Sequence, residues 1–238
     1  MKMENNKVYF RKYLENIRGV SKRTIHHYYD ALNHISRDLK KAGLVSNNIY
    51  EIQSVEELYK IRDYLKSDIG FLKLDSDGHR MYSSAMNNYI RFAEGFDFIG
   101  HKDSLCDLDV EIDVISDTRL YQCSIRKRLT IIKNQIIEAA EHKCSLDPGH
   151  ETFITESQNK PYMEGHHIIP MQHQEEFKVS LDVYANVICL CPTCHRMLHY
   201  ARTEDKRASL NRIYHERADR LAMSGIRLSN DEFIELVK

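Results

Sequence analysis

Two stretches of sequence decide the fold of the C-terminal half, Tyr162-Met-Glu-Gly-His-His-Ile-Ile-Pro170 and Cys191-Pro-Thr-Cys-His-Arg-Met-Leu-His199. The second stretch combines two cysteines at Cys-x-x-Cys spacing with two histidines four residues apart. Two thiolates at that spacing in a tight turn reach one tetrahedral zinc ion. Side chains four residues apart on a helix project from the same face. This part of the chain therefore predicts two kinds of metal chemistry close together.

Cys191 and Cys194 supply only half of a zinc site, and the nearest upstream ligands lie in Cys144-Ser-Leu-Asp-Pro-Gly-His150. The proline and glycine of that segment are typical of a tight, turn-rich loop. Asp147 competes with His150 for the fourth position, but a zinc ion held by three thiolates favours imidazole over carboxylate. The alternative is a group of buried or redox-active thiols. We expect a structural zinc site formed by Cys144, His150, Cys191 and Cys194.

The histidines predict a second metal site. His195 and His199 share one face of a helix that should begin near Cys194, so they can bind one cation together. His166 and His167 lie in a strand-like stretch, where adjacent side chains point to opposite faces. Only one residue of that pair can therefore join His195 and His199.

These residues resemble the HNH, or ββα-metal, nuclease family, in a zinc-stapled branch that includes restriction nucleases, some acting on modified cytosine. The match runs through both quoted stretches and Asn186, from about Lys143 to Ala201. The resemblance implies an antiparallel hairpin packed on one helix, with a catalytic divalent metal ion between them. It also implies roles: metal ligands His166, His195 and His199, general base His167, and Asn186 to hold the loop and the base in place.

The implied chemistry is hydrolysis of a phosphodiester bond in double-stranded DNA. A neutral imidazole that binds no metal can accept a proton from water at neutral pH, which suits His167. We expect magnesium or manganese at the catalytic site, although imidazole-rich coordination also suits nickel, cobalt or zinc. Whether His199 binds the metal ion or orients a phosphate stays open at this point.

The first 100 residues predict a helical domain. Apolar periodicity and capping residues indicate helices over residues 8–17, from Ser21 to Gly43, over 54–65 and after the turn Asp75-Ser-Asp-Gly78. The region weakly resembles the SAM-like core-binding domain of tyrosine recombinases, which implies a DNA clamp with Lys22 and Arg23 at phosphates. A generic helical bundle with a charged face is the alternative.

The region between the two halves is acidic. Residues 101–123 are interpreted as a linker with a short extended segment. Ser124 is expected to open a helix with Arg126, Lys127, Arg128 and Lys133 on its outside. This helix could carry phosphate contacts close to the active site, and the alternative is that it only braces the nuclease core. Further helices are expected over residues 207–222 and 230–237. The predicted architecture is α+β: an all-helical domain over 1–100 and a zinc-stapled nuclease domain over 124–238. Arg126, Arg128 and Arg196 are its candidate DNA-binding residues.

Composition limits the possible functions. The 238 residues carry a net charge of −1, so any attraction to DNA is local. No apolar run approaches the roughly 20 residues of a membrane span, and the N-terminus lacks a signal-peptide core, so we expect a cytoplasmic protein without a membrane partner. Cys106, Cys123 and Cys189 are expected to be reduced thiols.

The sequence therefore predicts a metal-dependent DNA endonuclease of the restriction type, with cleavage that can depend on base modification. A homodimer would follow from double-strand cleavage, because one ββα site cuts one strand. The alternatives are a non-enzymatic, zinc-stabilised DNA-binding protein and an RNA-directed nuclease of the same family.

Overall fold

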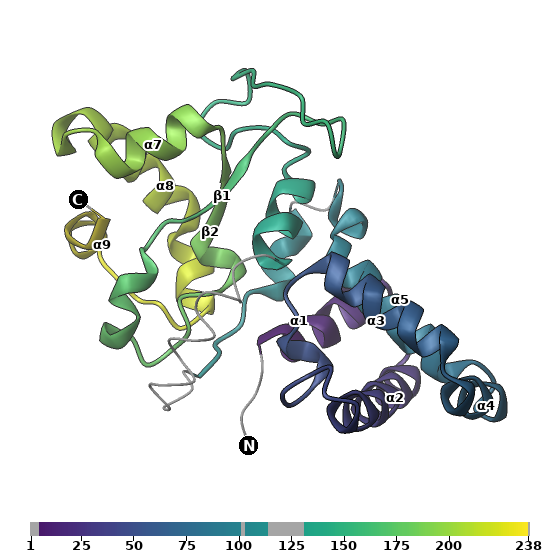
Figure 1. The fold of residues 1–238 in the computed structure, drawn as a ribbon. Helices are drawn as coiled ribbons and strands as arrows, with labels where there is room; N and C mark the ends of the chain where they lie inside the picture. The colour runs from purple at the N-terminus through teal and green to yellow at the C-terminus, as the bar shows by residue number, and fades with distance from the viewer. Residues whose placement is uncertain (1–4, 101–102, 114–130, 238) are drawn as a thin grey trace. The chain divides into compact units, whose positions relative to one another are not determined.

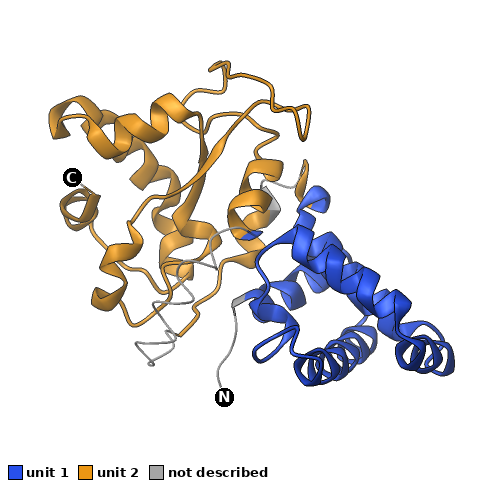
Figure 2. Ribbon diagram, viewed as in Figure 1, with its two compact units in different colours: residues 1–97, 119–131 blue, residues 98–118, 132–238 orange. Residues whose placement is uncertain are grey.

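The computed structural model describes residues 5–100, 103–113 and 131–237 (Figure 1). The chain divides into two compact units (Figure 2). Unit 1 comprises Met1–Asp97 with Arg119–Ile131, and unit 2 comprises Phe98–Thr118 with Ile132–Lys238. Within the described ranges, no helix is both long and apolar enough to cross a membrane.

All the regular secondary structure in the described part of unit 1 is helical. Its helices are α1 (Asn5–Lys12), continued by a π-helical turn at Tyr13–Ile17, α2 (Lys22–Lys41), α3 (Val55–Ser67), α4 (Ile69–Asp77) and α5 (Met81–Glu94). Two predicted N-caps are confirmed, since Ser21 Oγ accepts a hydrogen bond from Thr24 N and Ser54 Oγ accepts one from Glu57 N. The core contains aromatic rings such as those of Phe10, Tyr13, Tyr89 and Phe92, all fully buried.

The sequence prediction missed α4 and placed a turn within it. Residues Asp75–Asp77 belong to the last turn of α4, and the chain reverses only after them, where His79 and Arg80 adopt positive φ angles of 51° and 62°. Helix α4 buries no residue, and its apolar residues do not form a stripe along one face. Such a stripe is the pattern by which an amphipathic helix is predicted from sequence. Helix α4 starts at a local signal instead, because the Asp68 carboxylate caps the helix at Phe71 N, 2.6 Å away.

Unit 2 contains the predicted antiparallel pair of strands and following helix. Strand β1 (Glu164–His167) pairs with β2 (Val187–Leu190), with His167 opposite Val187 and Glu164 opposite Leu190. Helix α7 (Pro192–Tyr200) starts directly after β2 and packs against both strands (Figure 1). The long helix α8 (Thr203–Met223) and the short helix α9 (Asn230–Val237) complete the C-terminal end. The α+β fold class is confirmed.

The strands do not form a tight hairpin, since residues 168–186 separate them. This connection contains two short 3-10 helices, Met171–Glu176 and Tyr184–Asn186. Both strands are almost wholly buried, and residues 131–139 form a further helix whose Ile132 and Ile136 are also buried. The small sheet is therefore stabilised by helices, because two strands alone bury too little apolar surface.

The described part of the predicted linker packs as part of unit 2. Residues 103–108 form a 3-10 helix, and Leu105, Leu108 and Ile112 are buried. The carboxylate of Asp109 accepts hydrogen bonds from the Arg220 guanidinium at 2.5 and 3.0 Å. The predicted start of a helix at Ser124, with Arg126 and Arg128, lies outside the described residues.

Candidate active site and zinc site

The four predicted zinc ligands come together. One ligand atom from each of Cys144, His150, Cys191 and Cys194 lies within 4.8 Å of the others. The His150 Nδ1 atom is 3.5 Å from Cys191 Sγ and 3.3 Å from Cys194 Sγ. Asp147 lies outside this cluster, and its carboxylate is 3.3 Å from the other ring nitrogen of His150. This arrangement favours His150 as the fourth ligand and Asp147 as the residue that orients it.

The local backbone prepares the three sulfurs for a cation. Cys191 is the N-cap of α7, and its Sγ accepts a hydrogen bond from Cys194 N at 3.4 Å. Burial raises the pKa of the Cys144 thiol, but backbone donors at Cys191 and Asp147 outweigh it and lower the pKa to about 7. Burial and the neighbouring sulfurs raise the pKa of Cys194. Sulfurs this close repel one another as thiolates, so a zinc ion fits the donor set.

A separate cluster of three histidines lies at the sheet–helix junction. Ligand nitrogens of His166 on β1 and of His195 and His199 on α7 lie within 4.8 Å of one another. The three ring centroids are 4.8 to 4.9 Å apart. Burial, then the neighbouring His195 and His199, lowers the pKa of His166 to about 2, and burial also lowers the pKa of His199. Neutral imidazoles are the form that binds a divalent cation.

A carboxylate next to the histidines fixes the ring of His195. The Glu164 carboxylate on β1 accepts a hydrogen bond from His195 Nδ1, so His195 Nε2 is directed toward His199 Nε2, 3.2 Å away. The other Glu164 oxygen accepts a hydrogen bond from Tyr162 OH at 3.0 Å. Carboxylates that orient a ligand histidine in this way set its tautomer and strengthen metal binding.

His167 does not join the metal cluster. Its Nε2 atom lies 3.1 Å from Oδ1 of Asp182, and both side chains are buried, with exposed fractions of 8% and 3%. The alternation of side chains along β1 separates His167 from His166, as predicted. One histidine of the pair is thus placed with the candidate metal ligands and the other with a carboxylate.

Asn186 connects the segment after β1 to the loop that carries Asp182. The Asn186 side chain is fully buried; its Oδ1 accepts a hydrogen bond from Ile169 N at 2.8 Å. Its Nδ2 donates to Ile169 O at 3.0 Å and to Leu181 O at 2.9 Å. The side chain of Gln174 adds a second clamp, since it accepts from Leu181 N at 2.7 Å. The segments on both sides of the His167–Asp182 pair are therefore rigidly held.

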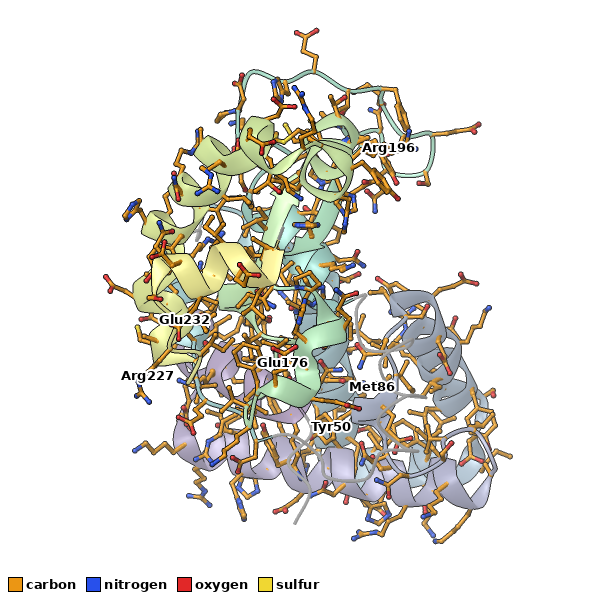
Figure 3. All side chains as sticks on the ribbon, turned by 90° about the vertical axis from the view of Figure 1, so that its left-hand side faces the viewer. Tyr50, Met86, Glu176, Arg196, Arg227 and Glu232 are labelled. Carbon is orange, nitrogen blue, oxygen red and sulfur yellow. The ribbon has the colours of Figure 1, made fainter. Side chains whose placement is uncertain are left out.

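The predicted DNA-binding residues fall in three places. Lys22 and Arg23 are exposed at the start of α2 in unit 1. Arg196 is exposed on α7 in unit 2 (Figure 3), in the same turn as His195 and His199. Arg126 and Arg128 lie outside the described residues.

Sequence reasoning assigned no function to Glu164 or Asp182. Glu164 has a local signal, because it lies two residues before His166 and so shares a strand face with it. Asp182 has no comparable signal, since it contacts His167 across 15 residues of chain. Its place depends on the path of the long connection between the strands.

Residues 148–201 match the family model of the HNH endonucleases. This segment is an HNH endonuclease domain. It contains the three-histidine cluster, the His167–Asp182 pair and all the candidate zinc ligands except Cys144, which lies just before it.

A curated relative is the type IV methyl-directed restriction enzyme EcoKMcrA of Escherichia coli strain K12. It is 32% identical over 72 residues, which is 30% of this chain and 24% of the relative. The chain thus matches about a quarter of that relative's length. No solved structure matches the chain. The likeness of the N-terminal region to recombinase core-binding domains stays a prediction.

Proposed function

We propose that the chain is a metal-dependent DNA endonuclease of the restriction type. The observation that carries this proposal is that two adjacent histidines of β1 have different surroundings. His166 faces His195 and His199, whereas His167 is bonded to Asp182 and kept out of that cluster. A purely structural metal site has no use for a buried histidine of this kind, but hydrolysis needs a base that binds no metal.

His167 is the proposed general base. Asp182 engages its Nε2 atom, which leaves Nδ1 to accept a proton from water. The water oxygen bonds to phosphorus as its proton passes to His167, the bond from phosphorus to the 3′ oxygen breaks, and that oxygen takes a proton from solvent. The products are a 5′-phosphate and a 3′-hydroxyl. Asn186 holds the loop and the base in register.

His166, His195 and His199 would hold the catalytic ion, for which magnesium or manganese is the proposed occupant. Such an ion, when bound, offsets negative charge on the phosphate and on the leaving oxygen. Glu164 keeps His195 in the tautomer that presents Nε2. Zinc held by Cys144, His150, Cys191 and Cys194 would instead stabilise the fold, because it joins the start of α7 to the loop before β1.

Double-stranded DNA is the proposed substrate, with Lys22, Arg23 and Arg196 as phosphate contacts and the helical N-terminal domain, residues 1–100, as a recognition element. The nuclease domain would occupy residues 124–238. The relative supports a restriction role, and with it we infer a cytoplasmic location and cleavage that can depend on base modification. Two copies would act together on the two strands, because one site cuts one strand.

Cleavage of methylated and unmethylated plasmid DNA tests the proposal, with magnesium, manganese or EDTA added. Wild type and His167→Ala are compared, and a parallel reaction contains single-stranded RNA. Metal-dependent fragments that are absent with His167→Ala are the expected result. Preferential loss of RNA would identify an RNA-directed nuclease instead, and DNA binding without cleavage of any substrate would contradict enzymatic activity.

A further inference from the structure

Lys133 lies against the backbone of β1, next to the proposed active site. It belongs to the helix formed by residues 131–139 and is half-buried. A Cβ atom built on Gly165 would lie 2.6 Å from both Cβ and Cγ of Lys133, which is closer than real side chains approach. Gly165 therefore lets the aliphatic stem of Lys133 pack directly on the strand, one residue before His166.

The charge of Lys133 acts on both parts of the site. It lowers the pKa values of His166 and His199, in addition to the larger effect of burial. Burial lowers the pKa of Lys133 itself, whereas the negative charges of Asp182 and Glu164 raise it. The geometric basis for this influence is the packing of Lys133 on Gly165, in the strand that carries both His166 and His167.

Asp182 and Glu164 act on this ammonium only through their charge. Within the described ranges, no residue forms a hydrogen bond or an ion pair with the Lys133 Nζ atom. By contrast, half-buried Lys160 donates to Glu138 at 2.7 Å, and buried Lys206 donates to Leu198 O at 2.7 Å. A cation that is half-buried and left without such a bond is suited to an anionic ligand.

We propose that the Lys133 ammonium binds a non-bridging oxygen of the scissile phosphate and is a catalytic residue. This inference rests on the proposed endonuclease function. A phosphodiester is anionic in the ground state and gains charge at its equatorial oxygens as the water attacks. An ammonium whose stem is packed on β1 stabilises that added charge with little reorganisation.

The sign of the effect on metal binding separates this role from simple packing. A positive charge within electrostatic range of His166 and His199 repels a divalent cation bound by them. Removing the charge should therefore strengthen metal binding while it weakens catalysis. Loss of a merely structural side chain would disturb the histidines and weaken both.

Lys133→Met keeps the aliphatic stem on Gly165 and removes the charge, and Lys133→Arg keeps both. Lys178→Met, at an exposed lysine of unit 2, is the control. Plasmid cleavage is measured as a function of manganese concentration. Binding of Mn²⁺ is measured separately by electron paramagnetic resonance, with each substitution made in a His167→Ala background.

We expect Lys133→Met to lower the cleavage rate on the order of 100-fold and to bind Mn²⁺ several-fold more tightly. Lys133→Arg should retain most of the activity, and Lys178→Met should resemble wild type. Wild-type cleavage by Lys133→Met, or a joint loss of cleavage and Mn²⁺ binding, would overturn the role of Lys133 and leave the endonuclease proposal intact. Failure of wild type to cleave any nucleic acid would reject both.

Discussion

The Asp182 carboxylate holds Nε2 of His167 at 3.1 Å, and the two side chains are buried together beside β1. Asp182 reaches this position through a connection clamped by Asn186 and Gln174. The contact selects the tautomer of His167 that leaves Nδ1 able to accept a proton. It also stabilises the imidazolium that forms once the proton has been taken, since the charges then attract each other.

Replacement of Asp182 should therefore impair catalysis through His167. We expect Asp182→Asn to lower kcat by roughly 10²- to 10⁴-fold, the range for a general base that loses its function, with little change in KM. Steady-state cleavage kinetics measure this effect. Single-turnover cleavage with a large excess of enzyme measures the residual rate of His167→Ala, which is too low to give fragments under the plasmid assay conditions. In that background Asp182→Asn should have no further effect on the residual rate, because the group that it positions is gone.

A substantial additional loss in the double variant would show that Asp182 acts on the fold or on the metal cluster. Circular dichroism and zinc content of Asp182→Asn provide the control for folding. Unchanged kcat in Asp182→Asn would remove the proposed role altogether.

The zinc site should contribute to stability rather than to the chemical step. Cys194→Ser and His150→Ala each remove one of four ligands, so we expect lower zinc content and a melting temperature reduced by several degrees or more. Asp147→Ala should retain zinc, since Asp147 lies outside the ligand cluster and its carboxylate contacts only Gly149 N and the ring of His150 among the contacts of its side chain. Cys106→Ser, at a thiol outside both clusters, is the matched control.

Metal analysis and thermal unfolding with and without chelator check these expectations. A zinc loss in Asp147→Ala equal to that in His150→Ala would make Asp147 the ligand. Unchanged zinc content in Cys194→Ser would contradict the zinc site itself.

The sequence was sufficient to predict those parts of the site that depend on local spacing. Turn geometry predicted that the two cysteines at the start of α7 bind one ion, and helical geometry predicted that its two histidines share one face. Strand alternation predicted the separation of His166 from His167. The loop containing Cys144 was predictable because its ligands cluster within seven residues. The fold class followed in the same way, from apolar periodicity in the N-terminal half and the metal motifs in the C-terminal half.

What could not be predicted depends on the tertiary path or on the absence of a pattern. Asp182 meets His167 only because the connection between the strands folds back, and Lys133 meets Gly165 from a helix 32 residues earlier in the chain. Helix α4 escaped prediction because it buries no residue and carries no apolar stripe. Residues 103–108 were interpreted as part of an acidic linker because acidic and apolar residues alternate in this region. That pattern gave no indication that Leu105 and Leu108 are buried.

Gly165 should be intolerant of any side chain. The alanine methyl group of Gly165→Ala would meet Cβ and Cγ of Lys133 at 2.6 Å and Cα at 3.1 Å, so the helix or the strand must move. Overpacking of this kind costs about 1–3 kcal/mol, and the displacement acts one residue from His166. We expect a lower melting temperature together with weaker Mn²⁺ binding.

The double variant Gly165→Ala, Lys133→Ala tests the cause. It retains the alanine methyl group and removes the contact with Lys133 Cγ, but the contacts with Cβ at 2.6 Å and Cα at 3.1 Å remain. Partial recovery of the melting temperature is expected, without recovery of cleavage, because the ammonium is absent. No recovery of stability would indicate that the backbone contact dominates, and wild-type stability of Gly165→Ala would contradict the close packing.

Asn186 should be the most sensitive position in the connection between the strands. Asn186→Asp keeps the size of the side chain but replaces the donor group that serves Ile169 O and Leu181 O. Two buried carbonyl groups then lose a donor and a buried carboxylate is introduced, so we expect a loss of roughly 2–6 kcal/mol in the free energy of unfolding. Urea unfolding monitored by circular dichroism measures this loss.

Cleavage by Asn186→Asp should fall as well, because Leu181 precedes Asp182 and its displacement would release His167 from its carboxylate. Stability close to wild type with cleavage abolished would instead assign Asn186 a direct part in the reaction.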